Sequence, residues 1–325
     1  MTPVGGPAAN ILITSAARKA PLVRAMKAAA ARAVPGAAVI AGDIDPQAPA
    51  RYVADGFWQL PRLNGTTPQS LMEGCRQRGI GTVLPTRDGE LAFWAEARTL
   101  FAEAGIDVIV SAPESVGCCL DKLAFADFGQ ARGLPFIPAA TALDGLVGER
   151  FVVKERFGAG SRSIGIDLPR AAALDHARGL EAPIFQPFEP GGEISIDAWM
   201  DRSGVPRGLV LRRRDCVVGG ESQITTTFRD AALEAAALEV LGALDLRGPA
   251  VMQAIVPPGG GLRVIECNCR FGGASTASIA AGLDMLYWSL AERHAPDAAP
   301  AFHRIEGELR QVRLPEDVVL HDFDL

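Results

Sequence analysis

The stretch RVIECNCRFGG, residues 263–273, decides the fold of this chain. Successive side chains of a strand point to opposite faces, so Glu266, Asn268 and Arg270 are predicted to share one face. Apolar residues precede these three and FGGAS follows them. That setting favours a strand that runs into a site, although a solvated strand face is the alternative.

The polar face of this predicted strand has the chemistry of a magnesium and phosphate site. Oxygens two residues apart on a strand lie roughly 7 Å apart, so Glu266 and Asn268 can share metal ions with a phosphate between them. Oxygen ligands suit Mg²⁺, which keeps waters and substrate phosphates. Arg270 adds a fixed cation for developing phosphoryl charge.

The cysteines of the motif are predicted to face the core. Cys267 and Cys269 alternate with the polar residues and are expected to act as small hydrophobes instead of metal ligands. The six cysteines of the chain include no C-x-x-C pair and no histidine at zinc-finger spacing. Free thiols and a cytoplasmic location are therefore expected.

Charge and composition exclude several classes of protein. The net charge is −6, and the densest basic cluster is residues 212–214, which argues against binding nucleic acid. Those arginines could still meet one phosphorylated or carboxylated small molecule. The chain has no apolar run of about 18 residues, so no membrane span is expected. Its 325 residues suit two or three lobes.

The first third of the chain alternates strands and helices, which indicates a parallel sheet. The ligand crevice of such a sheet lies at the carboxyl ends of its strands, where Ser15, Asp43 and residues 86–88 fall. The predicted strands are 10–15, 38–41, 82–85 and 108–111, and the predicted helices are 21–33, 71–78 and 89–104.

The pattern changes after about residue 112, and the last 25 residues carry no recognisable motif. The later strands are predicted at 151–155, 163–166, 184–188, 193–200, 208–211, 251–255 and 262–267. The later helices are predicted at 121–133, 231–244 and 277–292.

A glycine-rich turn, Phe157–Ser161, follows the strand that ends at Lys154. Glycines let a backbone approach a polyphosphate, and a lysine on the preceding strand can reach a phosphate oxygen. The turn is no Walker loop, and the strand expected after it argues against a dinucleotide-binding fingerprint. A kinase-like lid fits, but no H-R-D or D-F-G follows. A plain hairpin with a flexible turn remains the alternative.

Taken together and in order, several segments resemble the ATP-grasp enzymes, and within them the carbamoyl phosphate synthase large-chain-like proteins. The resemblance covers roughly residues 10–290. It rests on NILITSAARKAPLV, GDIDPQAPA with VLPTRDGEL, LDKLAFADF, FVVKERFGAGSRSIGI, FQPFEPGGEISIDAW, and MQAIV with LRVIECNCRFGG.

The resemblance implies an α/β fold with an α+β lid. It places a Rossmann-like pre-ATP-grasp domain at 1–112 and the ATP-grasp domain at 113–325. The latter would contain a small lid subdomain at about 120–186 and a C-terminal mixed-sheet subdomain.

The resemblance also implies ATP and Mg²⁺ as cofactors, with Mn²⁺ as a substitute, and a role for each matching residue. Lys122 and Lys154 would contact the ATP phosphates, with Lys154 also near the adenine. The backbone of Gln186 and Phe188 would bind the adenine edge, and Glu193 the ribose. The lid residues that would cover the nucleotide are Gly158, Gly160 and Ser161.

The metal and phosphoryl groups have their own implied residues. Gln253, Glu266 and Asn268 would hold Mg²⁺, although Gln253 is a weaker ligand than a carboxylate. Arg270, Lys154 and Arg214 would serve the phosphoryl transfer. Arg212 and Arg214, with the turn at residues 220–222, would contact phosphates or the acceptor, and surface ion pairing is the alternative for both.

Three positions depart from the pattern of the family. Lys154-Glu155 stands where K-P is common, and Asn268-Cys269-Arg270 replaces N-P-R. Ser15-Ala16-Ala17-Arg18 replaces S-A-G-R in a loop on the substrate side, which puts the identity of the acceptor in doubt.

The function implied is a ligase in which a small-molecule carboxylate attacks the γ-phosphate of ATP and an amine then displaces the phosphate. Its partners would be those two small molecules, with a homodimer as a family-level expectation. A small-molecule or carbamate kinase-like phosphotransferase and a non-catalytic ATP-binding module are the alternatives.

Overall fold

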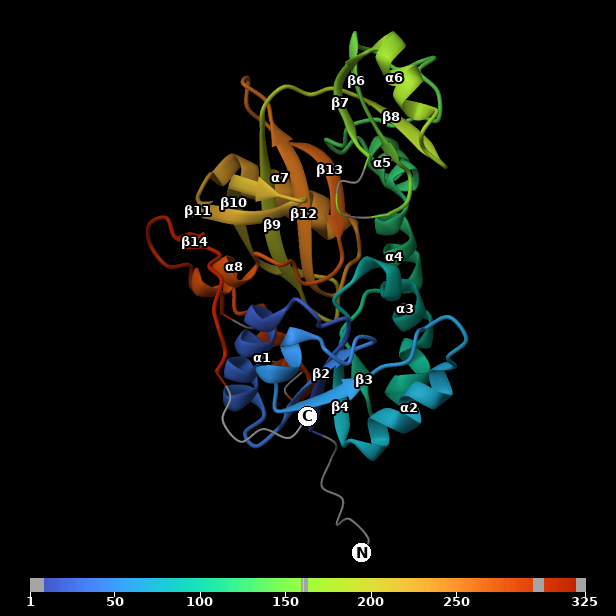
Figure 1. The fold of residues 1–325 in the computed structure, drawn as a ribbon. Helices are drawn as coiled ribbons and strands as arrows, with labels where there is room; N and C mark the ends of the chain where they lie inside the picture. Colours follow the sequence, from blue (N-terminus) through green and yellow to red (C-terminus); the bar gives the residue numbers. More distant parts are fainter. Residues whose placement is uncertain (1–8, 159, 161–162, 295–300, 320–325) are drawn as a thin grey trace, which may run out of the picture.

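The computed structural model describes residues 9–158, 160, 163–294 and 301–319, and three sheets lie within them. Figure 1 shows a parallel sheet at the lower end, a six-stranded antiparallel sheet in the middle and a three-stranded sheet at the upper end. The helices α4 (Pro113–Leu120) and α5 (Lys122–Ala131) run between the lower and upper sheets. Within the described residues, no helix is both long and apolar enough to cross a membrane.

The parallel sheet confirms the predicted alternation of strands and helices, and its strand order is β3-β2-β1-β4-β5. The strands are β1 (Asn10–Ile13), β2 (Val39–Asp43), β3 (Gly56–Gln59), β4 (Ile80–Leu84) and β5 (Asp107–Val108). The helices are α1 (Ala20–Ala33), η1 (Pro49–Tyr52), α2 (Pro68–Gln77) and α3 (Asp88–Glu103). Strand β3 was not predicted, since its four residues are too few to show a pattern.

The six-stranded sheet has the order β13-β12-β9-β10-β11-β14, and every neighbouring pair is antiparallel. Its strands are β9 (Gly192–Met200), β10 (Pro206–Val218), β11 (Glu221–Phe228), β12 (Gly248–Val256), β13 (Arg263–Asn268) and β14 (Arg310–Val312). The helix α7 (Ala231–Ala243) packs against β10. Strand β10 runs seven residues beyond its predicted end at Leu211, and the turn to β11 is made by Gly219 and Gly220, both with positive φ.

The predicted helix 277–292 is wrong, because the chain breaks into α8 (Thr276–Ala280) and α9 (Met285–His294). Gly282 lies between them with φ +102°, and a Cβ on it would meet the His303 carbonyl oxygen at 2.2 Å. Only glycine permits this close approach. The C-terminal segment that crosses here goes on to β14, which pairs with β11 and was also not predicted.

The three-stranded sheet, here called the lid sheet, has the order β7-β6-β8. Its strands are β6 (Arg150–Glu155), β7 (Gly165–Pro169) and β8 (Pro183–Pro187), with α6 (Arg170–Ala177) packed on them. The predicted hairpin is confirmed, because β6 and β7 pair antiparallel. The lid sheet has a small core of its own, formed by Leu143, Phe151, Val153, Ala173 and Phe185. It therefore packs as a separate unit.

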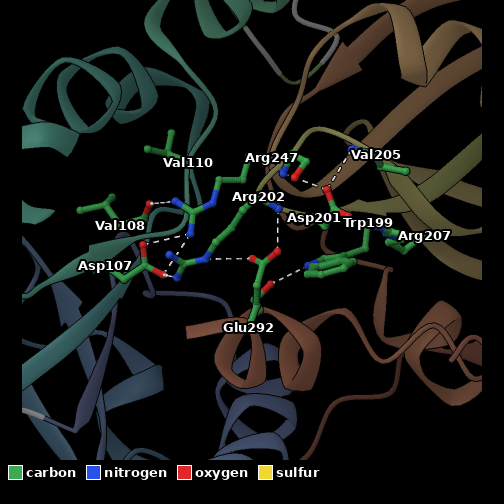
Figure 2. Close-up of polar contacts among 12 residues, drawn as sticks. Asp107, Val108, Val110, Trp199, Asp201, Arg202, Val205, Arg207, Arg247 and Glu292 are labelled. Atoms are coloured by element: carbon green, nitrogen blue, oxygen red, sulfur yellow. Dashed lines mark hydrogen bonds and ion pairs between the residues drawn. The ribbon is translucent and has the colours of Figure 1, made fainter. Parts of the chain in front are cut away.

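An ion-pair network fastens the parallel sheet to the six-stranded sheet, and Figure 2 shows its members converging on Asp107 of β5. Asp107 accepts from Arg202 Nη2 at 2.8 Å and from Arg247 Nη2 at 3.0 Å. Arg247 Nη1 also donates to the Val108 carbonyl at 3.2 Å, and the backbone N–H of Arg202 donates to Glu292 of α9 at 2.6 Å. Because these contacts join distant segments, they fix the sheets relative to each other.

A second charged cluster lies inside the six-stranded sheet and corrects the interpretation of Arg212. Arg212 is 2% exposed and pairs with Asp197, which is fully buried. Asp197 also accepts from the hydroxyls of Ser275 and Ser278. Arg212 is therefore a structural residue of the sheet and neither contacts an acceptor nor forms a surface ion pair, because it is buried and paired with Asp197.

Replacing Arg212 by methionine should destabilise the protein by about 3–5 kcal/mol, because the buried Asp197 carboxylate would lose its countercharge. The matched control is Arg213→Met, since Arg213 is exposed and pairs with Glu308 at the surface, where such a pair contributes about 0–1 kcal/mol. Urea unfolding midpoints measure both variants. Equal midpoints would contradict the structural role given to Arg212.

Candidate functional site

The predicted strand is β13, and its two faces differ as expected. Cys267 and Cys269 are 1% and 3% exposed, and the thiol of Cys119 hydrogen-bonds to Cys269 and, with burial, raises the pKa of Cys269 well above its usual range. Asn268 Nδ2 donates to Glu266 Oε1 at 3.2 Å on the opposite face. The cysteines are therefore core residues, and the polar pair faces the space between the sheets.

Gln253 lies on β12 directly opposite Glu266 and joins it to Arg214. With its amide nitrogen toward Glu266, the side chain donates to Oε1 at 2.9 Å and accepts from Arg214 Nη1 at 2.6 Å. Arg214 Nε lies 3.4 Å from Glu193 Oε1. Burial raises the pKa of Glu193, while the charge of Arg214 lowers it. Four predicted site residues from β9, β10, β12 and β13 thus form one continuous row.

Arg270 extends this row toward the parallel sheet. Its Nε and Nη2 donate to the two carboxylate oxygens of Asp88 at 2.6 and 2.8 Å, and Nη2 also reaches Asn268 Oδ1 at 3.3 Å. Burial opposes the charged guanidinium, but Asp88 and then Glu266 outweigh it and raise the pKa of Arg270. Asp88 is the first residue of α3, so the crevice loop after β4 orients this cation.

Lys154 on β6 is the most unusual cation of the site. It is 6% exposed, and its pKa is lowered to about 8, chiefly by burial; Glu266 and Glu193 oppose this shift, and Lys122 adds to it. Among the described residues its ammonium has no hydrogen-bond or ion-pair partner. A buried charge without a partner is costly, so this position is suited to an anion that arrives from outside.

The lid residues are brought toward the same space. Lys122 begins α5, and its Nζ donates to the Gly158 carbonyl at 2.7 Å. Gly158 and Gly160 have φ of +105° and +84°, which glycine adopts freely. The third predicted lid residue, Ser161, lies outside the described residues. Lys122 thus ties the glycine turn to the start of a helix.

The predicted adenine contacts lie on and just after β8. The side chain of Gln186 is buried and donates to the Ile137 carbonyl at 3.2 Å. The Phe188 N–H already donates to the Arg150 carbonyl at 2.9 Å. An adenine nitrogen would have to displace that bond to use this N–H, so the role predicted for the Phe188 backbone has a competitor inside the lid sheet.

Lys19 is a candidate residue that the sequence reasoning missed. It precedes α1, and its Nζ donates to both the carbonyl and the hydroxyl of Thr86, the latter at 2.7 Å. The loop that carries it is held by Asp43, whose carboxylate accepts from the Ala17 N–H at 2.9 Å. Its place in SAARK, the loop expected at the crevice after the first strand, was the signal available in the sequence.

Two family models match the chain. The model for the N-terminal domain of PylC-like proteins matches residues 11–109. The model described as ATP-grasp in the biosynthetic pathway with Ter operon matches residues 180–311, which include the whole row from Glu193 to Arg270. The second half of the chain thus matches the ATP-grasp family. The predicted resemblance to the ATP-grasp enzymes is confirmed, and no curated protein matches the chain.

Solved structures share the ATP-grasp fold. The biotin carboxylase domain of Hydrogenobacter thermophilus 2-oxoglutarate carboxylase is 16% identical, with a TM-score of 0.72 over 93% of this chain and 73% of that one. N5-carboxyaminoimidazole synthetase from Staphylococcus aureus is 15% identical, with a TM-score of 0.68 over 87% and 77%. An L-amino acid ligase from Bacillus licheniformis is 17% identical, with a TM-score of 0.65 over 87% and 73%. At such identities the likeness concerns the fold.

The donor set of β12 and β13 is compatible with magnesium. In the described part of the chain no group of three or more His, Cys, Asp and Glu side chains could hold a metal. Mg²⁺ needs fewer protein ligands, because it keeps waters and binds substrate phosphates. Glu266 supplies one carboxylate, and Asn268 adds an amide oxygen. Turning the Gln253 amide over would place its oxygen 2.9 Å from Glu266 Oε1, a spacing suited to two ligands of one ion.

Proposed function

We propose that this ATP-grasp protein is a Mg-ATP-dependent ligase that activates a small-molecule carboxylate as an acyl phosphate for attack by an amine. The observation that carries the proposal is the buried, unpartnered ammonium of Lys154 beside Glu266. A polyphosphate would supply the missing negative charge. Glu266 and Asn268 would hold the magnesium ion that accompanies it, which would neutralise phosphate charge when bound.

Each cation of the site has a separate place in the proposed reaction. Lys122 and Lys154 would bind phosphate oxygens of ATP from the lid side. Arg270, held by Asp88, would face the phosphoryl group during transfer, because its orientation is fixed before substrate arrives. Phosphoryl transfer requires positioning and charge neutralisation more than covalent chemistry, so this set of residues suits it.

The proposed chemistry has two steps. A carboxylate oxygen of the acceptor bonds to the γ-phosphorus while the bond to ADP breaks, which gives an acyl phosphate. The amine then bonds to the acyl carbon, loses a proton, and displaces inorganic phosphate. The lid sheet, which has a core of its own, would close over this intermediate and exclude water.

The fold neighbours support the class of reaction. One is named as an L-amino acid ligase, another as an N5-carboxyaminoimidazole synthetase bound to ADP, and a third was solved as a biotin carboxylase domain dimer with MgADP. We extend the proposal to a homodimer on the last of these. The six free thiols of the chain support a cytoplasmic location.

The purified protein should form a hydroxamate and ADP when it is mixed with Mg-ATP, hydroxylamine and a panel of small carboxylates. Hydroxylamine traps an acyl phosphate, whatever amine the enzyme uses naturally. Phosphorus NMR of the same mixtures identifies whether the phosphate is released or remains on a product. ADP with a stable phosphorylated product would support a kinase-like phosphotransferase instead. Mg-ATP binding without any turnover would support a non-catalytic module.

A further inference from the structure

Lys19 lies where the parallel sheet meets the six-stranded sheet, since it contacts Thr86 and feels the charge of Arg270. Its pKa is lowered to about 8, chiefly by burial and also by the nearby charge of Arg270, against the opposing charges of Glu90, Asp88 and Glu221. Glu90 and Asp88 belong to α3 beside the parallel sheet, and Arg270 and Glu221 belong to the six-stranded sheet side. Charges from both walls therefore act on this one ammonium.

Each carboxylate near Lys19 is already bound by another group. Asp88 pairs with Arg270, and Glu221 pairs with Arg313 at 2.6 Å. Lys19 itself donates only to the uncharged oxygens of Thr86. Among the described residues, no carboxylate lies within ion-pair distance of its ammonium.

Glu90 is also occupied, although its charge acts on Lys19. Its Oε1 accepts the backbone N–H groups of Thr86 and Arg87, each at 3.0 Å. Its Oε2 accepts from Trp94 Nε1 at 3.2 Å. This carboxylate therefore holds the loop after β4 in place and is 3% exposed, so it is not available to a ligand.

Arg87, on the loop after β4, is a second cation without a carboxylate partner among the described residues. It is exposed, and its Nε donates to the Ser15 hydroxyl at 3.3 Å. Its guanidinium lies over the start of α3, where a Cβ on Gly89 would meet Nη1 at 2.8 Å. Ser15 in turn has φ +48°, an uncommon backbone for serine. Lys19 and Arg87 thus flank the contact between Ser15 and Thr86.

We propose that Lys19 and Arg87 bind an anionic group of the acceptor, a carboxylate or a phosphate, that is distinct from the carboxylate activated beside Arg270. That the anion belongs to the acceptor rests on the proposed function. The anion site itself is inferred only from the charges around Lys19 and Arg87. The acceptor is accordingly a molecule with two anionic groups, one at the parallel sheet and one at the phosphoryl site. Neutral and singly charged acids bind more weakly because they leave one end of the site without its counterion.

The test uses the full-length protein saturated with Mg²⁺ and β,γ-imido-ATP, so that the nucleotide and γ-phosphate positions are filled. Inorganic phosphate and succinate are then added in separate titrations, and the thermal unfolding midpoint is measured. Sodium chloride at the same ionic strength is the reference for each titration. At least one of the two anions should raise the midpoint of the wild type in a saturable way. The anion that does so identifies a phosphate or a carboxylate as the preferred group.

Lys19→Met should weaken the binding of that anion at least tenfold. Lys19→Arg should retain most of the stabilisation by the anion, because it keeps the positive charge. The matched control is Lys27→Met, since Lys27 lies on α1 but pairs with Asp55 at 2.6 Å. Equal anion stabilisation in wild type and Lys19→Met, or none beyond chloride in the wild type, would overturn the inference. The experiment involves no turnover, so its result is independent of the hydroxamate test of the ligase.

Discussion

Replacing Lys154 by methionine should lower ATP turnover by roughly 10³-fold or more, in line with the loss of a group that stabilises phosphoryl charge. The same change should make the nucleotide-free protein more stable. Methionine has a similar volume and no charge, so it removes the cost of burying an ammonium that is 6% exposed and has no partner in the described chain.

The pH dependence of stability gives this prediction a clear sign. The pKa of Lys154 is about 8 in the folded protein against 10.5 for an ordinary lysine. Between these pH values the unfolded chain binds more protons, so the stability of the wild type rises with pH. Below about pH 8 the free energy of unfolding of the wild type is therefore lower than that of Lys154→Met by on the order of 3 kcal/mol. This difference disappears by about pH 10.5.

Urea unfolding of wild type and Lys154→Met at pH 7, 9 and 10.5 measures this convergence. Lys27→Met is the control, because Lys27 lies at the surface and pairs with Asp55. Its difference from the wild type should stay small across the same range. A Lys154→Met protein with wild-type turnover, or one less stable than wild type at pH 7, would contradict the place given to Lys154.

The sequence predicted the parts of this protein that depend on local patterns. Alternation along β13 separated Glu266 and Asn268 from the buried cysteines, and both faces lie as expected. Strand and helix periods located nearly all of the parallel sheet, because its strands are continuous apolar runs. The glycine turn after Lys154 does join two antiparallel strands.

What the sequence could not predict depends on partners that are distant along the chain. The sequence allows Arg212 either a contact with phosphates or the acceptor or a surface ion pair, and only the pairing of β9 with β10 shows that it binds the buried Asp197. The orientation of Arg270 depends on Asp88, 182 residues away. Gly282 breaks a helix because a later segment crosses it. Sequence periodicity contains no information about such crossings.

The crevice illustrates the same limit at the level of function. Lys19 attracted no notice in the sequence, since a single lysine before a helix is ordinary. Its meaning depends on Thr86, and on the fact that Asp88 and Glu221 are already paired with arginines. The positive charge that favours an anionic acceptor therefore depends on residues brought together by folding, and no single sequence motif contains it.

Glu266→Gln should reduce ATP turnover by roughly 10²–10³-fold and raise the magnesium concentration needed for half-maximal rate. Glutamine keeps the shape of the side chain and can still accept from Asn268, which now donates to Glu266 Oε1 at 3.2 Å. It removes the carboxylate of the strand pair, so magnesium would be left with neutral amide oxygens and would bind more weakly. The fold should be retained, because Glu266 is not part of a buried ion pair.

Gln253→Glu is the opposing variant, since Gln253 lies directly across from Glu266 on β12. A second carboxylate there should lower the magnesium requirement, and Arg214 Nη1, 2.6 Å from the amide oxygen of Gln253, would offset part of the added charge. Initial rates at fixed ATP over a magnesium titration measure both variants against wild type. Opposite shifts would place the metal between the two strands. An unchanged magnesium dependence in Glu266→Gln would show that this residue does not bind the metal. It would also contradict the proposal that magnesium on β13 and Lys154 on β6 bind the same polyphosphate.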